Sequence, residues 1–283
     1  MDERGLGKRL QQARQSAGLT QQQLCQKANL SFSTLTKIER GAIKSPSIFT
    51  IQAIAGALNL NLDELVGNSA SPARSSRHLG KTKSGASFIY FDINGCLVSS
   101  DQAAFPRISA DTGKPPDLIE SAYWHFNDQG RRGQLNMADF NVKLSKKIGV
   151  GELDWQKYYL EAVNPVTEMH EIVKWAARHY KIGLLTNTLP DLVTALRASG
   201  QIPDVPYDVI IDSSEVGVVK PEIEIYKIAG QKADCPPEEI MLIDDTRANL
   251  MAAAKLGWHA MLFDDAQPEK SAAAVRQALE PAG

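Results

Sequence analysis

Asp92 follows directly after an apolar run at residues 88–91, and Asn94 lies two residues further along the chain. A carboxylate at the end of a strand can attack phosphorus, and a second carboxylate two residues later would donate and accept the proton. Asn94 can make a hydrogen bond at that position, but its amide cannot transfer a proton. The pair therefore predicts a phosphoryl-transfer site that lacks its acid–base group.

Further polar groups follow other apolar runs. Thr186 and Asn187 come after residues 182–185, Asp244 and Asp245 come after residues 240–243, and Lys220 precedes a helical pattern. Ligands of doubly wound sheets bind at the carboxyl ends of the strands, so these groups should converge although they are far apart in sequence. Three carboxylates, a hydroxyl and a lysine predict a site for Mg²⁺ and a phosphate group.

Apolar runs that alternate with helical patterns predict a parallel sheet covered on both faces, an α/β doubly wound domain over residues 87–283. The expected strands are residues 88–91, 182–185, 209–211, 240–243 and 260–263, and the expected helices include 166–180, 192–198, 223–232 and 247–256. Residues from about 98 to 165 break this alternation with helical, aromatic-rich sequence. We interpret them as an inserted helical cap.

Residues 1–67 have a different pattern, which predicts an all-α domain of five short helices. Leu6, Leu10 and Ala13 repeat at helical spacing, and Thr20 with Gln23 forms a capping-box signature at the start of a second helix. Residues 68–86 are rich in serine and glycine and carry net charge +4, which predicts a flexible basic linker. A basic arm along DNA is the alternative for this linker.

The charge of the chain is unevenly spread. The 283 residues carry net charge −2, but residues 1–67 carry +3 and residues 87–283 carry −9. A basic end joined to an acidic remainder indicates a nucleic-acid-facing domain and a separate second domain. No apolar run approaches the ~20 residues of a membrane span, the start lacks the apolar core of a signal peptide, and the three cysteines lie far apart. These features favour the cytoplasm.

The segments 19–24, 33–41 and 62–65 resemble the helix-turn-helix domain of phage-repressor-like (Cro/C1, or XRE-type) regulators. The resemblance implies a five-helix fold whose third helix enters the major groove of double-stranded DNA, and a homodimer on a palindromic operator. By position, the resemblance assigns base-facing roles to Ser31, Phe32, Ser33, Thr36 and Lys37, and phosphate contacts to Gln21 and Lys44.

The strand-end residues, together with residues 217–222, 243–246 and 253–258, resemble the four motifs of the haloacid-dehalogenase-like (HAD) superfamily. Details of the third and fourth motifs, with residues 133–140 in the cap, look most like the sugar-phosphatase and epoxide-hydrolase-N-terminal branch. The resemblance implies that Asp92 is the nucleophile and a Mg²⁺ ligand together with the Asn94 backbone carbonyl, Asp244 and, directly or through water, Asp245. It implies that Thr186, Lys220 and the Asn187 backbone bind the phosphoryl group.

Asn94 departs from the phosphatases of this superfamily, which have aspartate at that position. The carbonyl can still reach a metal, but the acid–base step, typically worth ~100 to 10,000-fold, is lost. We therefore expect a transcription regulator whose second domain binds Mg²⁺ and a small phosphorylated metabolite with weak or no turnover. The alternatives are an active Mg²⁺-dependent phosphatase and a partner-binding scaffold with a relic pocket. Arg131 and Arg132 in the cap could grip a ligand, but exposed side chains are the favoured interpretation.

Overall fold

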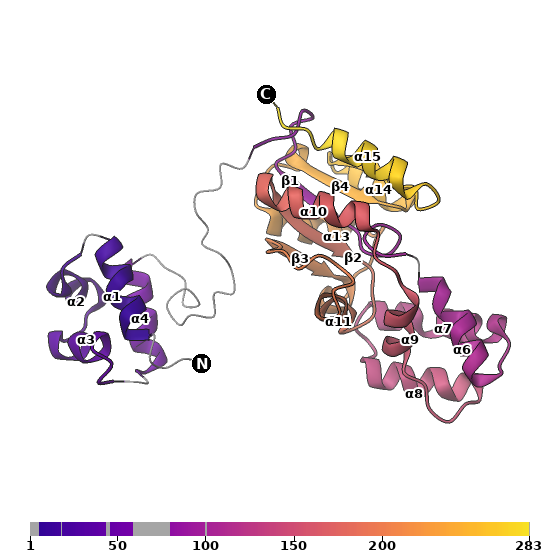
Figure 1. Ribbon diagram of the computed structural model, residues 1–283, viewed down its shortest axis with the longest axis horizontal. Helices are drawn as coiled ribbons and strands as arrows, with labels where there is room; N and C mark the ends of the chain where they lie inside the picture. The colour runs from indigo at the N-terminus through magenta and orange to yellow at the C-terminus, as the bar shows by residue number, and fades with distance from the viewer. Residues whose placement is uncertain (1–5, 18, 44–45, 59–79, 100, 283) are drawn as a thin grey trace. The chain divides into compact units, whose positions relative to one another are not determined.

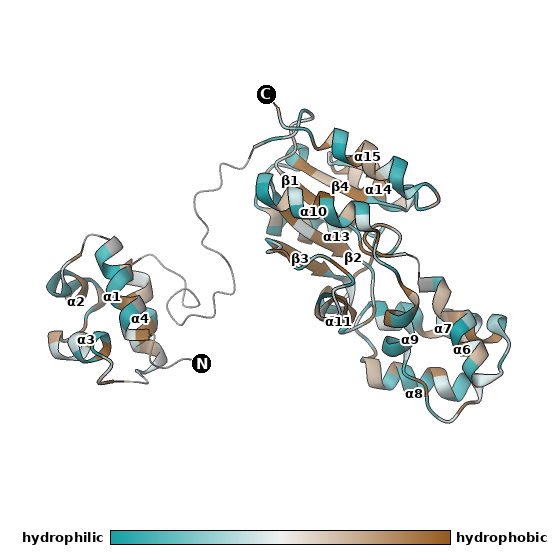
Figure 2. Ribbon diagram, in the orientation of Figure 1, coloured by the Kyte–Doolittle hydropathy of each residue, from teal (hydrophilic) through white to brown (hydrophobic). Residues whose placement is uncertain are grey.

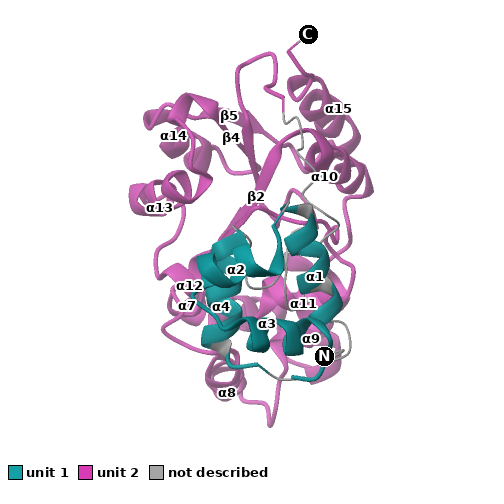
Figure 3. Ribbon diagram, turned by 90° about the vertical axis from the view of Figure 1, so that its left-hand side faces the viewer, with its two compact units in different colours: residues 1–75 teal, residues 76–283 magenta. Residues whose placement is uncertain are grey.

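The chain divides into two compact units, residues 1–75 and 76–283 (Figure 3). The computed structural model describes residues 6–17, 19–43, 46–58, 80–99 and 101–282 (Figure 1). None of the described helices is both long and apolar enough to cross a membrane.

The first unit is helical, as predicted. Its described helices are α1 (Leu6–Ser16), α2 (Gln21–Ala28), α3 (Phe32–Glu39) and α4 (Ile48–Leu58). The predicted capping box is confirmed, because the Thr20 hydroxyl accepts from the Gln23 backbone N–H and the Gln23 side chain accepts from the Thr20 N–H. The fifth helix, expected at residues 62–66, lies outside the described residues.

A small apolar core joins these four helices, with Leu10, Leu24, Leu35 and Ile54 fully buried. A buried ion pair lies beside it, where the Arg14 guanidinium donates to both carboxylate oxygens of Glu39 at 2.7 and 3.2 Å. Since an unpaired charge in this place would be costly, the pair ties α1 to the end of α3.

The second unit contains a parallel five-stranded sheet of order β3-β2-β1-β4-β5, which confirms the predicted fold class. The strands are β1 (Phe88–Phe91), β2 (Lys181–Thr186), β3 (Val209–Asp212), β4 (Ile240–Asp244) and β5 (His259–Leu262). All five lie where the apolar runs predicted them. The central strand β1 is buried along its whole length.

Helices cover both faces of the sheet (Figure 3). One face packs against α10 (Thr167–His179) and α15 (Pro268–Ala278), and the other packs against α13 (Ile223–Ala233) and α14 (Arg247–Lys255). The alternation of β1 side chains supplies both cores: Ile89 and Phe91 belong to the first, Phe88 and Tyr90 to the second. The apolar strands stand out between polar outer helices (Figure 2). Short helices α11 (Leu192–Ala198) and α12 (Ser213–Val216) follow β2 and β3.

Four longer helices are inserted between β1 and α10, within the segment expected to form a cap. They are α6 (Ala104–Thr112), α7 (Pro116–Arg131), α8 (Met137–Ile148) and α9 (Trp155–Ala162). Their core is aromatic: the rings of Tyr123 and Trp155 stack with centroids 4.3 Å apart, and Phe105 and Phe140 pack against them. These rings form the aromatic interior of the cap, which is continuous with the core on one face of the sheet.

Residues 80–86 pack onto the second unit, so the expectation that the flexible linker extends to residue 86 is wrong for these residues. Lys81 pairs with Glu239, and Lys83 pairs with Glu280. Backbone hydrogen bonds to His179 and Glu280 and burial of Thr82 and Ala86 fix the segment further. Arg74 and Arg77, the other two linker bases, lie outside the described residues.

Candidate functional site

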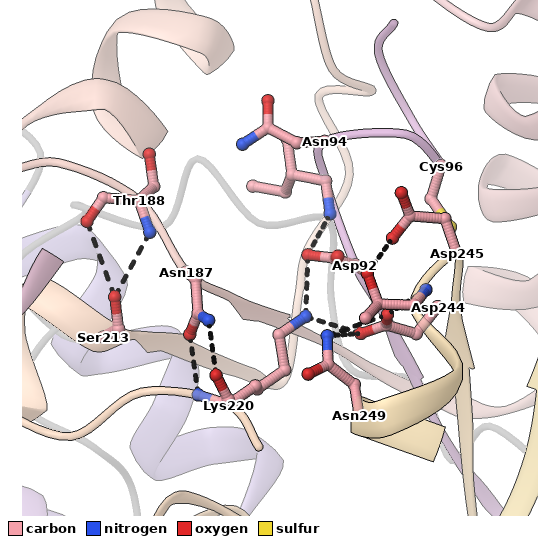
Figure 4. Close-up of polar contacts among 12 residues, drawn as sticks. Asp92, Asn94, Cys96, Asn187, Thr188, Ser213, Lys220, Asp244, Asp245 and Asn249 are labelled. Carbon is pink, nitrogen blue, oxygen red and sulfur yellow. Dashed lines mark hydrogen bonds and ion pairs between the residues drawn. The ribbon is translucent and has the colours of Figure 1, made fainter. Parts of the chain in front are cut away.

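The predicted strand-end residues meet at the carboxyl edge of the sheet (Figure 4). Asp92 follows β1, Thr186 ends the neighbouring β2, and Asp244 ends β4 on the other side of β1. Asp92 and Asp244 are both buried. The parallel order of these three strands is thus what brings together residues about 150 positions apart in sequence.

Lys220 lies between the two carboxylates. Its Nζ is 2.9 Å from Asp92 Oδ1 and 2.6 Å from Asp244 Oδ2, and its side chain is buried. The loop that carries Lys220 is clamped by Asn187, whose amide donates to the Lys220 carbonyl and accepts from the Lys220 N–H, each at 2.8 Å. Asn187 was expected to act through its backbone; the structure shows its side chain positioning the lysine loop.

The electrostatics of this cluster follow from its burial. Burial raises the pKa of the Asp92 carboxyl to about 7; Lys220 opposes this shift, while Asp244 and Asp245 add to it. Burial alone would lower the pKa of Lys220, but the charges of Asp92 and Asp244 outweigh burial and raise it. Burial, and then Asp244, also raises the pKa of Asp245. Three carboxylates therefore face a single ammonium group.

This arrangement fits a divalent cation. One carboxylate oxygen from each of Asp92, Asp244 and Asp245 lies within 4.8 Å of the others. Hard oxygen ligands with excess negative charge are what Mg²⁺ requires. The hydrogen bonds distinguish the two neighbouring aspartates, because both Asp244 oxygens already accept from Lys220, Asn249 or the Thr246 N–H. Among the described residues, Asp245 accepts a side-chain hydrogen bond from the Thr246 hydroxyl alone, so its geometry is the better suited to direct ligation.

Gly95 is required for the close approach of Asp245. It has φ of +78°, and a Cβ atom at this position would lie 2.2 Å from Asp245 Oδ2. Any side chain here would be strained and would push the carboxylate away from Asp92. The glycine next to Asn94 thus belongs to the site, although sequence reasoning gave it no role.

Two buried hydroxyls face the same edge without partners. Thr186 is fully buried and Thr188 nearly so, and neither Oγ1 atom has a hydrogen-bond partner among the described residues. The backbone of Thr188 is held by Ser213, which accepts from its N–H at 3.2 Å. An unpaired buried hydroxyl is costly unless a ligand pairs with it. Thr186 was expected to bind phosphate, and its position suits that role.

Asn94 contacts the cap. Tyr159 of α9 donates its hydroxyl hydrogen to Asn94 Oδ1 at 2.6 Å. The Asn94 side chain therefore accepts a hydrogen bond from the cap, as an aspartate at this position could. Tyr159 was missed in the sequence, because nothing in the pattern of α9 separates it from the other aromatic residues of the cap.

Both cap arginines, expected to be exposed, interact with other groups. Arg132 makes two hydrogen bonds to Glu222, which lies two residues after Lys220, at 2.6 and 3.2 Å. Arg131 lines a small cavity beside Asn94, and its Nε is buried. The expectation was wrong because both residues lie at the end of α7, where the cap meets the core. Gly133 marks that contact, since a Cβ there would lie 2.0 Å from the Ser214 carbonyl oxygen.

The residues predicted to face DNA lie on or near α3. Ser31 caps this helix, accepting from the Thr34 N–H at 3.1 Å. Phe32, Ser33 and Lys37 are exposed, whereas Thr36 is half-buried.

Gln21 donates to Glu39 at 2.7 Å, so its amide braces the buried ion pair. Lys44 lies outside the described residues. The roles of all these residues toward DNA stay predictions.

Comparison with known proteins agrees with this geometry. Residues 88–257, more than half of the chain, match the family model described as haloacid dehalogenase-like hydrolase. The chain belongs to this family. Residues 10–65 match the helix-turn-helix model, which confirms the resemblance of the first unit to helix-turn-helix domains.

Among solved structures, this HAD-like chain resembles a HAD family enzyme of Bacteroides thetaiotaomicron, solved as an aspartate-to-alanine mutant with magnesium and inorganic phosphate. The TM-score is 0.55 at 21% identity, over 63% of this chain and 94% of that one. At this identity the likeness shows the fold alone.

Two curated proteins each match a short part of the HAD-like chain. The immunity repressor protein of Bacillus phage phi105 is 45% identical over 62 residues, 22% of this chain and 42% of the relative. Bifunctional epoxide hydrolase 2 of Rattus norvegicus is 36% identical over 59 residues, 21% of this chain and 11% of the relative. The chain thus spans less than half the length of each of these relatives.

Proposed function

We propose that this chain is a transcription regulator that binds DNA through its first unit and a phosphorylated small molecule with Mg²⁺ through its second, with weak or no turnover. The observation that carries the proposal is Asn94 in an otherwise assembled site. Lys220 contacts both Asp92 and Asp244, but the side chain that Tyr159 contacts is an amide, which cannot transfer a proton. A phosphorylated ligand that is bound but not hydrolysed can continue to act as a signal.

The contacts support a division of roles within the site. Asp92 holds the nucleophile position, and the Thr186 hydroxyl and Lys220 would bind phosphoryl oxygens. Asp92, the Asn94 carbonyl and Asp245 would hold Mg²⁺, while Asp244 fixes Lys220. Bound Mg²⁺ would neutralise charge on the phosphoryl oxygens. This assignment reverses the expected order of the two aspartates, since Asp244 is the one whose oxygens are already hydrogen-bonded.

The match to repressor-type helix-turn-helix domains supports DNA binding by α3, which presents Ser33 and Lys37 to solvent. Such modules usually act as dimers on two half-sites, so we propose a homodimer on a palindromic operator. Placement in the sugar-phosphatase and epoxide-hydrolase branch is part of the same proposal and is supported by the short match to the rat enzyme.

The test measures whether the site and DNA are coupled. The operator is first selected from a random library with the full chain, and DNA affinity is then measured by fluorescence anisotropy with and without Mg²⁺ and beryllofluoride, a phosphoryl mimic. We expect the two conditions to differ at least ~5-fold, because coupling of two sites is typically worth ~1–3 kcal/mol. Asp92→Ala should abolish the difference. Equal affinities in the wild-type chain would contradict regulation through this site.

An active Mg²⁺-dependent phosphatase is the second candidate, and one contact favours it. The Tyr159 hydroxyl lies 2.6 Å from Asn94 Oδ1, so the cap brings a proton-bearing group to the place where the acid is missing. In that case the wild-type chain should release phosphate rapidly, and Tyr159→Phe should lower kcat by more than ~100-fold. Slow phosphate release by the wild-type chain that does not change in Tyr159→Phe would exclude this candidate.

A further inference from the structure

The loop of residues 217–222, which carries Lys220, is bound from two directions. On the core side, the Asn187 side chain makes two hydrogen bonds of 2.8 Å to the Lys220 backbone (Figure 4). On the cap side, the guanidinium of Arg132 donates to Glu222 Oε1 at 2.6 Å and to Oε2 at 3.2 Å. A side chain of the cap therefore holds the loop two residues after the lysine.

Arg132 is itself held in place by its own helix. Its Nε donates to both carboxylate oxygens of Asp128, one turn earlier in α7, at 3.0 and 3.1 Å. The two terminal nitrogens remain for Glu222, so the planar guanidinium bridges two carboxylates in a fixed orientation. Only 23% of the Arg132 side chain is exposed, so solvent screens this pair less than most surface ion pairs. Hydrogen bonds from Arg132 also lower the pKa of the Glu222 carboxyl.

A backbone contact supports the same connection between the cap and the loop. Helix α7 packs against α12, the short helix that precedes the loop. Gly133, directly after Arg132, has φ of +66°, and a Cβ atom there would lie 2.0 Å from the Ser214 carbonyl oxygen. Glycine is therefore required for the cap backbone to come this close to α12. The end of α7 thus contacts both ends of the segment 213–222.

The loop in turn determines where the Lys220 ammonium lies. Within it, the Glu222 N–H donates to the Val219 carbonyl at 2.9 Å, which closes a turn around Lys220. The lysine Nζ then lies 2.9 Å from Asp92 and 2.6 Å from Asp244, with 1% of the side chain exposed. Because a buried ammonium between two carboxylates has few other positions, a shift of the loop backbone would change both distances.

We propose that Arg132 is a positioning residue for the phosphoryl site: through Glu222 it fixes the loop that places Lys220 against Asp92. The proposal rests on the proposed function, in which Lys220 binds phosphoryl oxygens. It gives the cap a part in forming the site that requires no contact between Arg132 and the ligand. Asn187 supplies the corresponding contact from the core.

The first measurement needs no ligand. Hydrogen–deuterium exchange of the full chain, followed by mass spectrometry, reports opening of the loop, because the amide hydrogens of Lys220 and Glu222 are both hydrogen-bonded. We expect peptides that contain the loop to exchange at least ~3-fold faster in Arg132→Gln than in the wild type. Arg132→Lys, which keeps the charge, should exchange more slowly than Arg132→Gln. Equal exchange in Arg132→Gln and the wild type would overturn the inference.

The second measurement is the affinity for beryllofluoride at saturating Mg²⁺, by isothermal titration calorimetry. Arg132→Gln should bind at least ~3-fold more weakly, because bidentate pairs contribute more than ordinary surface pairs. Glu222→Gln should weaken binding similarly, and the double variant should be no worse than either single variant, since both changes break one interaction. Unchanged affinity in Arg132→Gln, or losses that add in the double variant, would contradict a role through Glu222.

The matched control is Arg107→Gln. Arg107 is an exposed arginine of the same cap, and its partner Glu161 also belongs to the cap. Urea denaturation of both variants separates positioning from stability: if Arg132→Gln lowers only the free energy of unfolding and leaves the loop exchange and the affinity unchanged, Arg132 is merely structural and the inference fails. If beryllofluoride does not bind the wild-type chain, the proposed phosphoryl site is refuted, whereas the exchange measurement still decides whether Arg132 holds the loop.

Discussion

Asn94→Asp is the substitution that tests the reasoning most directly. Aspartate has nearly the shape of asparagine and can accept the same hydrogen bond from Tyr159, so the cap contact at 2.6 Å should persist. The change restores a proton-transferring group two residues after the nucleophile. Acid–base catalysis is typically worth ~100 to 10,000-fold, or about 2.7 to 5.4 kcal/mol at 1.36 kcal/mol per decade.

The structure also predicts that Asn94→Asp lowers the stability of the chain when Mg²⁺ is absent. A fourth carboxylate would join Asp92, Asp244 and Asp245 around the single Lys220, where burial already raises the pKa of Asp92 to about 7. The added negative charge should make the variant less stable than the wild type when Mg²⁺ is chelated and should strengthen its dependence on the ion. Higher turnover and greater Mg²⁺ dependence are therefore expected together.

The assay is steady-state phosphate release from p-nitrophenyl phosphate with Mg²⁺. We expect kcat to rise at least ~100-fold in Asn94→Asp with KM changed only a few-fold, because the restored group acts in the transition state rather than in binding. Asp92→Asn in the same background should abolish the activity. The reasoning is refuted if the wild type is already rapid and Asn94→Asp changes kcat by less than ~3-fold.

Three further predictions concern the nucleophile, a buried aspartate and the DNA-facing helix. Incubation with acetyl phosphate and Mg²⁺ should phosphorylate Asp92, the carboxylate oxygen displacing acetate, and mass spectrometry should find the product longer-lived in the wild type than in Asn94→Asp. Rapid loss from both chains would contradict a role for Asn94 in persistence. Burial raises the pKa of Asp212 to about 6, against hydrogen bonds from Ser214 that oppose the shift. The folded state therefore binds the Asp212 proton more tightly than the unfolded state does. The free energy of unfolding should consequently fall by up to about 3 kcal/mol as the pH rises from ~4 to ~6. Urea denaturation of Asp212→Asn should lack this fall, and parallel pH curves for both chains would count against it. Lys37→Ala should weaken binding to the selected operator by ~5–100-fold but leave scrambled DNA nearly unaffected. An equal loss of affinity for operator and scrambled DNA would make Lys37 a phosphate contact instead, and the slope of log K against log salt concentration would then be smaller by about one.

The sequence was sufficient for the sheet and for the centre of the site. Apolar runs identify strands buried on both faces, and parallel strands present their carboxyl ends at one edge, so Asp92, Thr186 and Asp244 had to converge. Because one residue at the end of each strand is enough to mark this edge, the prediction needed no knowledge of the cap.

The remaining features depend on contacts that no local pattern specifies. Tyr159 contacts Asn94, which lies 65 residues earlier in the sequence. The sequence of α9 does not distinguish Tyr159 from the other aromatic residues of this helix. The different roles of Asp244 and Asp245 come from which one Lys220 and Asn249 contact. Residues 80–86 have linker composition but find hydrogen-bond partners at the end of the chain. In each case, tertiary packing decides between alternatives that composition leaves equal.

The anchoring of residues 80–86 also determines where force enters the second unit. Lys81, Thr82 and Lys83 are bound at the amino-terminal edge of β1, whereas Asp92 lies at the opposite edge, about 13 Å from Phe88 at ~3.3 Å per residue. A force applied through residues 80–86 would load β1 lengthwise and shear its hydrogen bonds to β2 and β4 at the same time. Shear across a central strand is mechanically resistant. The candidate site therefore lies at the opposite end of β1 from the residues through which such a force would enter.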